Sequence, residues 1–259
     1  MASCHFDGQT KYSRKPCTVC GIFCEKALQK TKKCAIIKIE KAQRNQQERK
    51  STVALKKPPF TVGIVGASGS GKHALTRALC AHFGEVALIS QTDYARSRDE
   101  LAYPERIHIN YEHPSAYEHG LLAAHLRGLR WGNSVDAPVY DKVKHLRAAT
   151  IRRIASAPLI LVRGPLLFAD EELSSQFDLR IYLDTDADLR IIRHILQKEE
   201  EKQSLYTTVE QYLATGRPTY DRFIAPQKEK AHIILTGDGG SAGTAARAIA
   251  AIEEAMAKK

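Results

Sequence analysis

Residues 66–73 read GASGSGKH, and this segment constrains the fold more strongly than any other part of the sequence. It follows a β-rich run, FTVGIV, and precedes an apolar, helix-forming segment, HALTRALCAHFG. Glycines in such a strand–loop–helix unit let successive backbone N–H groups point at phosphate oxygens, while the lysine reaches the terminal phosphates. The segment therefore predicts a nucleotide site, and the alternative is a glycine-rich turn without a ligand. The predicted nucleotide-binding residues are Gly66, Ala67, Ser68, Gly69, Ser70, Gly71, Lys72 and His73.

The glycine motif departs from its usual form at its last position. The pattern GxxxxGK[ST] places a serine or threonine after the lysine, and the hydroxyl of that residue binds Mg²⁺. Here His73 stands at that position. The sequence therefore predicts nucleotide binding but leaves Mg²⁺ without one of its usual ligands.

Apolar, strand-like runs alternate with helical segments along the rest of the chain. The strand-like runs occupy residues 60–65, 86–90, 159–162, 179–183 and 232–236. Helical spacing of apolar residues is found in residues 114–132, 186–202 and 241–259. This alternation predicts an α/β fold with a parallel sheet covered by helices on both faces. The segment from Asp136 to Ile154 breaks the pattern, and we expect a small hairpin over the carboxyl edge of the sheet, where ligands bind in such folds.

Residues 1–59 hold the entire net charge of the chain. They contain 14 Lys and Arg against 4 Asp and Glu, an excess equal to the total of +10. Residues 22–50 contain neither glycine nor proline, which predicts a basic helix that ends before the linker KKPPF. We therefore predict a basic N-terminal extension over residues 1–58 and a folded domain over residues 59–259. Basic arms of this kind bind RNA or another polyanion, and the alternative is a solvated tail.

Five of the six cysteines lie in this extension. Cys17 and Cys20, in CTVCG, have the two-residue spacing with which two thiolates reach one zinc ion. A second pair with this spacing is missing, so unligated thiols are the alternative to a Zn²⁺ site.

The sequence carries no signal for a membrane or for secretion. No apolar run reaches the length of a membrane helix, and the first residues lack the apolar core of a secretory signal. We therefore expect no membrane partner and a cytoplasmic or organelle-matrix location.

Six segments of the folded domain occur in the order of one known family. They are GIVGASGSGK, LISQTDYARS, NYEHPSAYE, PVYDKVKHLR, LDTDADLRIIRHI and VEQYLATGRPTYDRFIAPQKEKAHIIL. They resemble the nucleotide loop and the motifs LSQDSFYR, NFDHPDAFD, PxYDFxxHSR, VDTDADxRLxRRI and QYxxxVKPxFxxFIxPTKxxADIII of uridine and uridine–cytidine kinases, in the phosphoribulokinase/uridine kinase group. The resemblance implies a P-loop nucleoside-kinase fold and transfer of the γ-phosphoryl group of ATP to the 5′-hydroxyl of a pyrimidine nucleoside.

The resemblance also implies roles for single residues. Lys72 and Asp93 are the catalytic candidates, although the family's proton-accepting aspartate aligns without gaps to Thr92, one residue earlier. The residues that the resemblance places against the substrate are Glu112, Tyr140, His145, Arg193 and Gln211. Lys142 replaces the aromatic ring that the family carries between Tyr140 and His145.

The departures from the family pattern concern positions that handle negative charge. Arg163 stands in place of an acidic residue near the metal, and Gln197 and Ser204 replace arginines of the lid. Two interpretations follow from these departures and from His73. The chain is either a nucleoside kinase with altered metal handling and weak activity, or a catalytically silent relative. In the second case it serves as a structural subunit of a large ribonucleoprotein or cytoskeletal assembly, anchored by the basic extension.

Overall fold

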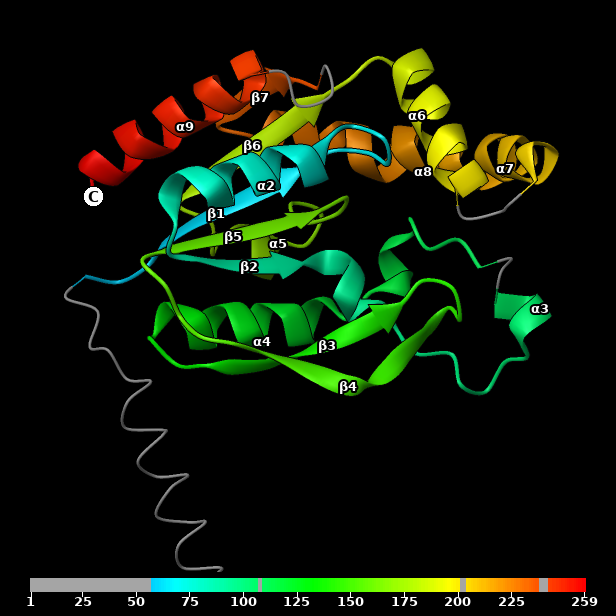
Figure 1. Ribbon diagram of the computed structural model, residues 1–259, viewed down its shortest axis with the longest axis horizontal. Coiled ribbons are helices and arrows are strands. Elements are labelled where there is room, and N and C mark those ends of the chain that lie inside the picture. The colour runs from blue at the N-terminus through cyan, green and yellow to red at the C-terminus, as the bar shows by residue number, and fades with distance from the viewer. Residues whose placement is uncertain (1–56, 107–108, 201–203, 238–241) are drawn as a thin grey trace, which may run out of the picture. The chain divides into compact units, whose positions relative to one another are not determined.

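The computed structural model describes residues 57–106, 109–200, 204–237 and 242–259, without the side chains of residues 198–200. The fold is built on a parallel sheet of five strands in the order β2-β5-β1-β6-β7 (Figure 1). These strands are β1 (Phe60–Val65), β2 (Val86–Ser90), β5 (Leu159–Gly164), β6 (Leu179–Asp184) and β7 (Ile233–Thr236). The predicted strands and the predicted α/β fold are therefore confirmed.

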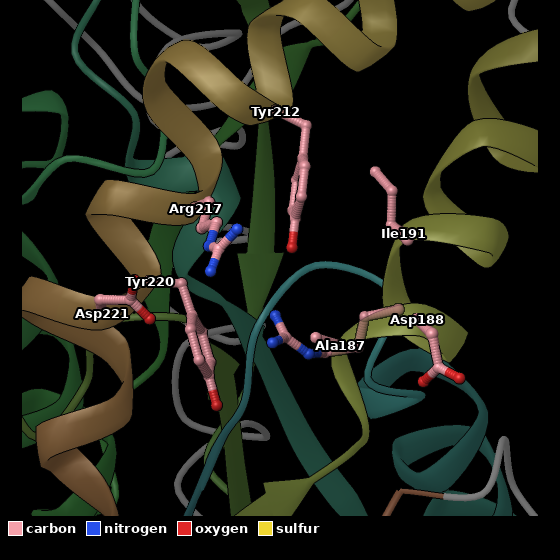
Figure 2. Close-up of a pocket in the computed structure, with 8 residues that line it drawn as sticks. Ala187, Asp188, Ile191, Tyr212, Arg217, Tyr220 and Asp221 are labelled. Carbon is pink, nitrogen blue, oxygen red and sulfur yellow. The ribbon is translucent and has the colours of Figure 1, made fainter.

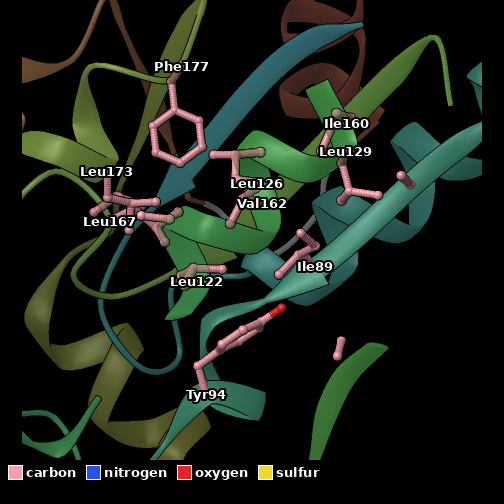
Figure 3. Close-up of a cluster of buried hydrophobic side chains, with 14 of the residues drawn as sticks. Ile89, Tyr94, Leu122, Leu126, Leu129, Ile160, Val162, Leu167, Leu173 and Phe177 are labelled. Atoms are coloured by element: carbon pink, nitrogen blue, oxygen red, sulfur yellow. The ribbon is translucent and has the colours of Figure 1, made fainter. Parts of the chain in front are cut away.

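Helices cover both faces of the sheet, since its strands send apolar side chains to each side in alternation. On one face lie α2 (Lys72–Phe83) and α9 (Ala242–Ala257), which pack on β1, β5 and β6 (Figure 1). On the other face lies α4 (His119–Arg130). The buried leucines of α4 and their partners in the sheet, shown in Figure 3, include Leu122, Leu126, Leu129, Ile89, Ile160 and Val162. The central strand β1 is buried along its whole length, as its position between two layers of helices requires.

The predicted hairpin is formed by two antiparallel strands, β3 (Val135–Asp141) and β4 (Leu146–Ile154). The pairing shifts register between Pro138 and Tyr140. The hairpin contacts the short helix η1 (Gln91–Tyr94), which directly follows β2. It therefore lies at the carboxyl edge of the sheet, as expected.

The remaining described helices connect the strands or follow them. They are α3 (Tyr103–Arg106), η2 (Pro114–Ala116), α5 (Glu171–Ser174), α6 (Ala187–Glu200), α7 (Leu205–Gln211), η3 (Tyr212–Gly216), α8 (Arg217–Thr219), η4 (Tyr220–Ile224) and η5 (Ala225–Lys230). None of the described helices combines the length and the apolar composition needed to cross a membrane. The predicted basic helix over residues 22–50 lies outside the described residues, so the extension and its boundary after residue 58 stay predictions.

Candidate functional site

The glycine loop joins the end of the central strand to the start of a helix. β1 ends at Val65 and α2 begins at Lys72. Gly69 and Gly71 have φ angles of 75° and 91°, in the left-handed region that side chains disfavour. The loop therefore curls tightly in front of α2, where backbone N–H groups and the helix dipole favour an anion.

The loop is held from beneath by two side chains of the β6–α6 segment. Arg193 donates to the carbonyl oxygens of Gly69, at 3.3 Å, and Gly237, at 2.8 Å. Thr185 donates to the carbonyl oxygens of Ser70, at 3.3 Å, and Gly237, at 3.0 Å. Arg193, predicted to contact substrate, thus lies under the nucleotide loop and positions it.

Lys72 lies within the curl of the loop. Its ammonium group donates to the carbonyl oxygens of Gly66 and Ala67, both at 2.7 Å. Burial lowers the pKa of Lys72 to about 8, although the nearby carboxylate of Glu112 opposes this shift. Burial raises the pKa of Glu112 in turn, and Lys72 and Arg190 oppose that shift. Lys72, Glu112 and Arg190 therefore belong to one electrostatic centre.

Two substituted positions, 90 residues apart, meet beside the lysine. Arg163, at the end of β5, donates from Nη1 to Nδ1 of His73 at 2.7 Å and to the hydroxyl of Thr76 at 3.1 Å. Because a guanidinium can only donate, this nitrogen of His73 must be the acceptor, and the ring is neutral. The charge of Arg163, followed by burial, lowers the pKa of His73, which keeps the ring neutral.

This pair does not fit Mg²⁺. Magnesium takes oxygen ligands from carboxylates, hydroxyl groups, phosphates and water. At the two positions where the family pattern supplies oxygen, this chain carries the imidazole of His73 and the guanidinium of Arg163. A fixed positive charge therefore lies where the pattern would bring a metal ion.

Asp93, in η1, carries its carboxylate toward the hairpin. Arg152 of β4 pairs with this carboxylate, with 3.1 Å between Nη2 and Oδ2. Burial raises the pKa of Asp93, whereas the charges of Arg152 and Arg163 oppose the shift. Asp93 thus shares its surroundings with Arg163, and the proton-accepting role predicted for it stays a prediction.

Three aromatic rings lie close together beside the hairpin. The ring of Tyr111 stacks on His145, with 5.1 Å between centroids, and lies 5.9 Å from the ring of Tyr140. His145, at the turn of the hairpin, has a φ angle of 53°. The hydroxyl groups of Tyr111 and Tyr140 are buried, and burial together with the neighbouring Tyr111 raises the pKa of Tyr140. The structure therefore brings the predicted residues Tyr140 and His145 together.

Sequence reasoning missed Tyr111, which joins the other two rings. Its signal was present in NYEHP, where the quoted family motif NFDHP has phenylalanine. The added hydroxyl lies beside Tyr140, whose pKa is raised by burial and by Tyr111.

The helical segment that follows α6 approaches the same centre. Asn110 donates to the hydroxyl of Thr219 at 2.7 Å. A Cβ built on Gly216 would lie 3.9 Å from Oε2 of Glu112. Gln211 ends α7, immediately before the turn that contains Gly216, and its carbonyl oxygen accepts a hydrogen bond from Thr215.

Two substituted lid positions are exposed in the structure. Gln197 and Ser204 both reach solvent, and Ser204 precedes α7 as its N-cap. His194, where the family has a second arginine, lies with Nδ1 3.2 Å from the hydroxyl of Ser68 in the glycine loop. The lid segment therefore touches the loop through an imidazole instead of a guanidinium.

The predicted zinc ligands Cys17 and Cys20 lie outside the described residues. Among the residues that the structure does describe, no group of three or more His, Cys, Asp or Glu side chains could hold a metal ion. The Zn²⁺ site stays a prediction for the extension.

A glycine loop with its lysine, placed between the central strand and a helix of a five-stranded parallel sheet, is typical of a P-loop nucleotide-binding domain. The model of the phosphoribulokinase/uridine kinase family matches residues 61–239. The chain therefore belongs to the phosphoribulokinase/uridine kinase family, whose members use ATP.

Individual relatives agree with this assignment. A uridine kinase of Geobacillus kaustophilus is 36% identical over 186 residues, which covers 71% of this chain and 88% of that protein. A uridine kinase of Oceanobacillus iheyensis is 36% identical over 187 residues, covering 71% of this chain and 89% of that protein. The fold is also similar to phosphoribulokinase from Rhodobacter spheroides, with a TM-score of 0.52 at 16% identity, covering 70% of this chain and 71% of that one.

Proposed function

We propose that this domain binds ATP in the glycine loop with Arg163 in the place of Mg²⁺. In this proposal it transfers the γ-phosphoryl group slowly to the 5′-hydroxyl of a pyrimidine nucleoside. The hydrogen bond of 2.7 Å between Arg163 and His73 carries the proposal, because it puts a guanidinium beside the loop lysine. A guanidinium can neutralise phosphate charge without any metal.

The same substitution accounts for slow transfer. Phosphoryl transfer relies on positioning and on charge that follows the phosphate as it moves, which a metal bridging two phosphates supplies. Arg163 is held by His73 and Thr76, so it offers fewer free donors to the phosphate. Losing one preorganised electrostatic contact typically lowers kcat by about 10²–10³-fold.

Calorimetric titration with ATP in excess Mg²⁺ and in excess chelator tests the proposal. The two affinities are expected to agree within about threefold, a small difference on the free-energy scale of binding. Uridine phosphorylation is expected to stay far below the usual turnover range of roughly 1–10³ s⁻¹. Turnover within that range, together with ATP binding that requires Mg²⁺, would contradict the proposal.

A second function is favoured by the charge of the extension. Residues 1–59 carry an excess of 10 positive charges that a nucleoside kinase has no evident use for. We propose that this arm binds RNA or another polyanion and anchors the domain in a larger assembly. The affinity of the full chain for RNA is expected to fall steeply as salt rises, because binding releases counterions. Deletion of residues 1–55 is the test, and unchanged RNA affinity after the deletion would show that the arm does not bind RNA.

A further inference from the structure

A cavity of about 350 Å³ lies between the start of α6 and the helical segment η3–α8–η4. Figure 2 shows its walls: the hydroxyl end of Tyr212 and the guanidinium end of Arg217 both point into the space between the two helical segments. The residues that line the cavity are Ala187, Asp188, Arg190, Ile191, Tyr212, Arg217, Tyr220 and Asp221. Two arginines and two tyrosines thus offer hydrogen-bond donors to one space.

Arg190 is the buried cation of this cavity, with only 5% of its surface exposed. Its Nε donates to the carbonyl oxygen of Thr185 at 3.0 Å, and its guanidinium lies 3.8 Å from the ring centroid of Tyr220. Within the described residues, the structure shows no ion pair and no further hydrogen bond of this guanidinium. The carboxylate of Glu112 interacts with this charge without forming a direct ion pair. Since no described group bonds to the two terminal nitrogens, they are suited to an anion that enters the cavity.

The helix opposite Arg190 has an unusual backbone. η3 and η4 are five-residue π-helical turns, and Arg217 lies directly between them, at the start of α8. Turns of this kind are rare and occur frequently at functional sites. They turn Tyr212 and Arg217 toward the cavity, where a regular helix would have presented a different set of side chains.

The two carboxylates of the cavity, Asp188 and Asp221, belong to its lining. Asp188 accepts a hydrogen bond from the backbone N–H of Leu189 at 2.8 Å. In Figure 2, Asp188 and Asp221 lie at opposite sides of the group, on α6 and on η4. The donors of Arg217 and Tyr212 therefore face the space without an intervening carboxylate.

The cavity adjoins the glycine loop. A Cβ built on Gly69 would lie 2.5 Å from the backbone oxygen of Arg190. The charge of Arg190 also acts on Lys72 and on Glu112. When the loop holds a nucleotide, a phosphate in the cavity would therefore follow the nucleotide's own phosphates and form one row with them.

We propose that this cavity is a phosphate subsite in which Arg190 and Arg217 bind a phosphate group beyond those held by the loop. The phosphate is either the terminal phosphate of the nucleotide or the same group after its transfer, as the 5′-phosphate of the product. The inference rests on the proposed function, because the loop must hold the nucleotide for the row of phosphates to exist.

The test compares ATP, ADP and uridine monophosphate as ligands of the full chain in excess chelator. Arg217 is exposed, so Arg217→Gln is expected to fold, and Arg190→Lys keeps the buried charge without the planar fork. Arg222→Gln is the matched control, because Arg222 lies on η4 against Phe223 and does not line the cavity. Thermal melting of each variant reports on folding separately.

The Arg217→Gln variant is expected to lose about tenfold or more in affinity for one phosphate ligand, as a charge-assisted hydrogen bond is removed. A loss confined to ATP assigns the terminal phosphate, and a loss confined to uridine monophosphate assigns the phosphate of the product. Three results would overturn the subsite. The first is an equal loss for all three ligands, and the second is an equal effect of Arg222→Gln. The third is an affinity within about twofold of wild type for both cavity variants. ADP binding by the wild type, which does not need the cavity, reports on the proposed function alone.

Discussion

Replacing His73 with Ser and Arg163 with Glu in the same chain is expected to raise uridine phosphorylation by on the order of 10²-fold and to make it depend on Mg²⁺. The double change removes a fixed cation and supplies a hydroxyl and a carboxylate, the oxygen ligands that Mg²⁺ prefers. The two side chains already meet at 2.7 Å, so the new oxygens arise next to each other and next to Lys72. Steady-state phosphorylation of uridine across a range of Mg²⁺ concentrations measures the effect.

Two controls separate metal binding from a loss of repulsion. Arg163→Met removes the cation without adding an oxygen ligand, and this variant is expected to lose ATP affinity and to gain no activity. Melting of the double variant is expected to rise with Mg²⁺, because a metal that binds the folded state stabilises it, while wild-type melting stays unchanged. If the double variant neither gains activity nor responds to Mg²⁺, then Arg163 does not occupy a metal position.

The affinity of the wild type for ATP is expected to fall above pH 8, by up to about tenfold per pH unit. Lys72 has a pKa of about 8 in the free site, because burial disfavours its charged form. A bound phosphate favours the ammonium and raises this pKa, so binding above pH 8 requires the uptake of a proton. Below pH 8 the ammonium is already present, and affinity should depend little on this residue's protonation. Titrations with ATP between pH 6.5 and 10 measure the profile.

Two variants assign this pH dependence to Lys72. Lys72→Met is expected to bind ATP roughly 10–10²-fold more weakly at pH 7, since a hydrogen bond to a charged group is lost, and its affinity should no longer fall above pH 8. Lys72→Arg keeps its charge through this range and should also give a flat profile. Titration of His73 or Cys80 does not account for a fall in ATP affinity that begins at pH 8, because the pKa of His73 is lowered and that of Cys80 is raised. A steep fall that persists in Lys72→Met would show that another group titrates.

Much of the fold could be predicted because its signals are local. Each strand appeared as a short apolar run, and the helices α2, α4 and α9 appeared as apolar residues at helical spacing. The loop from Gly66 to Lys72 depends on glycine conformations and on the strand and helix beside it. A hairpin was expected over Asp136 to Ile154 because this segment breaks the pattern, and the structure pairs β3 and β4 there as antiparallel strands.

The candidate site was predictable only in part. The residues that match a motif, such as Lys72, Tyr140 and His145, were selected from their own segments, and their roles stay predictions. Arg193 was selected as well, and the structure shows that it donates to the carbonyl oxygens of Gly69 and Gly237. Tyr111 was missed although it lies in the motif NYEHP, because its contact with His145 exists only in the folded chain.

By itself, the sequence determined a P-loop α/β domain, the loss of an oxygen ligand at His73 and the concentration of charge in residues 1–59. Only the tertiary structure decided that Arg163 reaches His73, that Arg152 pairs with Asp93, and that Arg190 and Arg217 line one cavity. The physical reason lies in the range of the interactions. Loop, strand and helix preferences act within a few residues, whereas these contacts join positions up to 90 residues apart. Such contacts depend on the strand order β2-β5-β1-β6-β7 and on the π-helical turns around Arg217, which no short segment specifies alone.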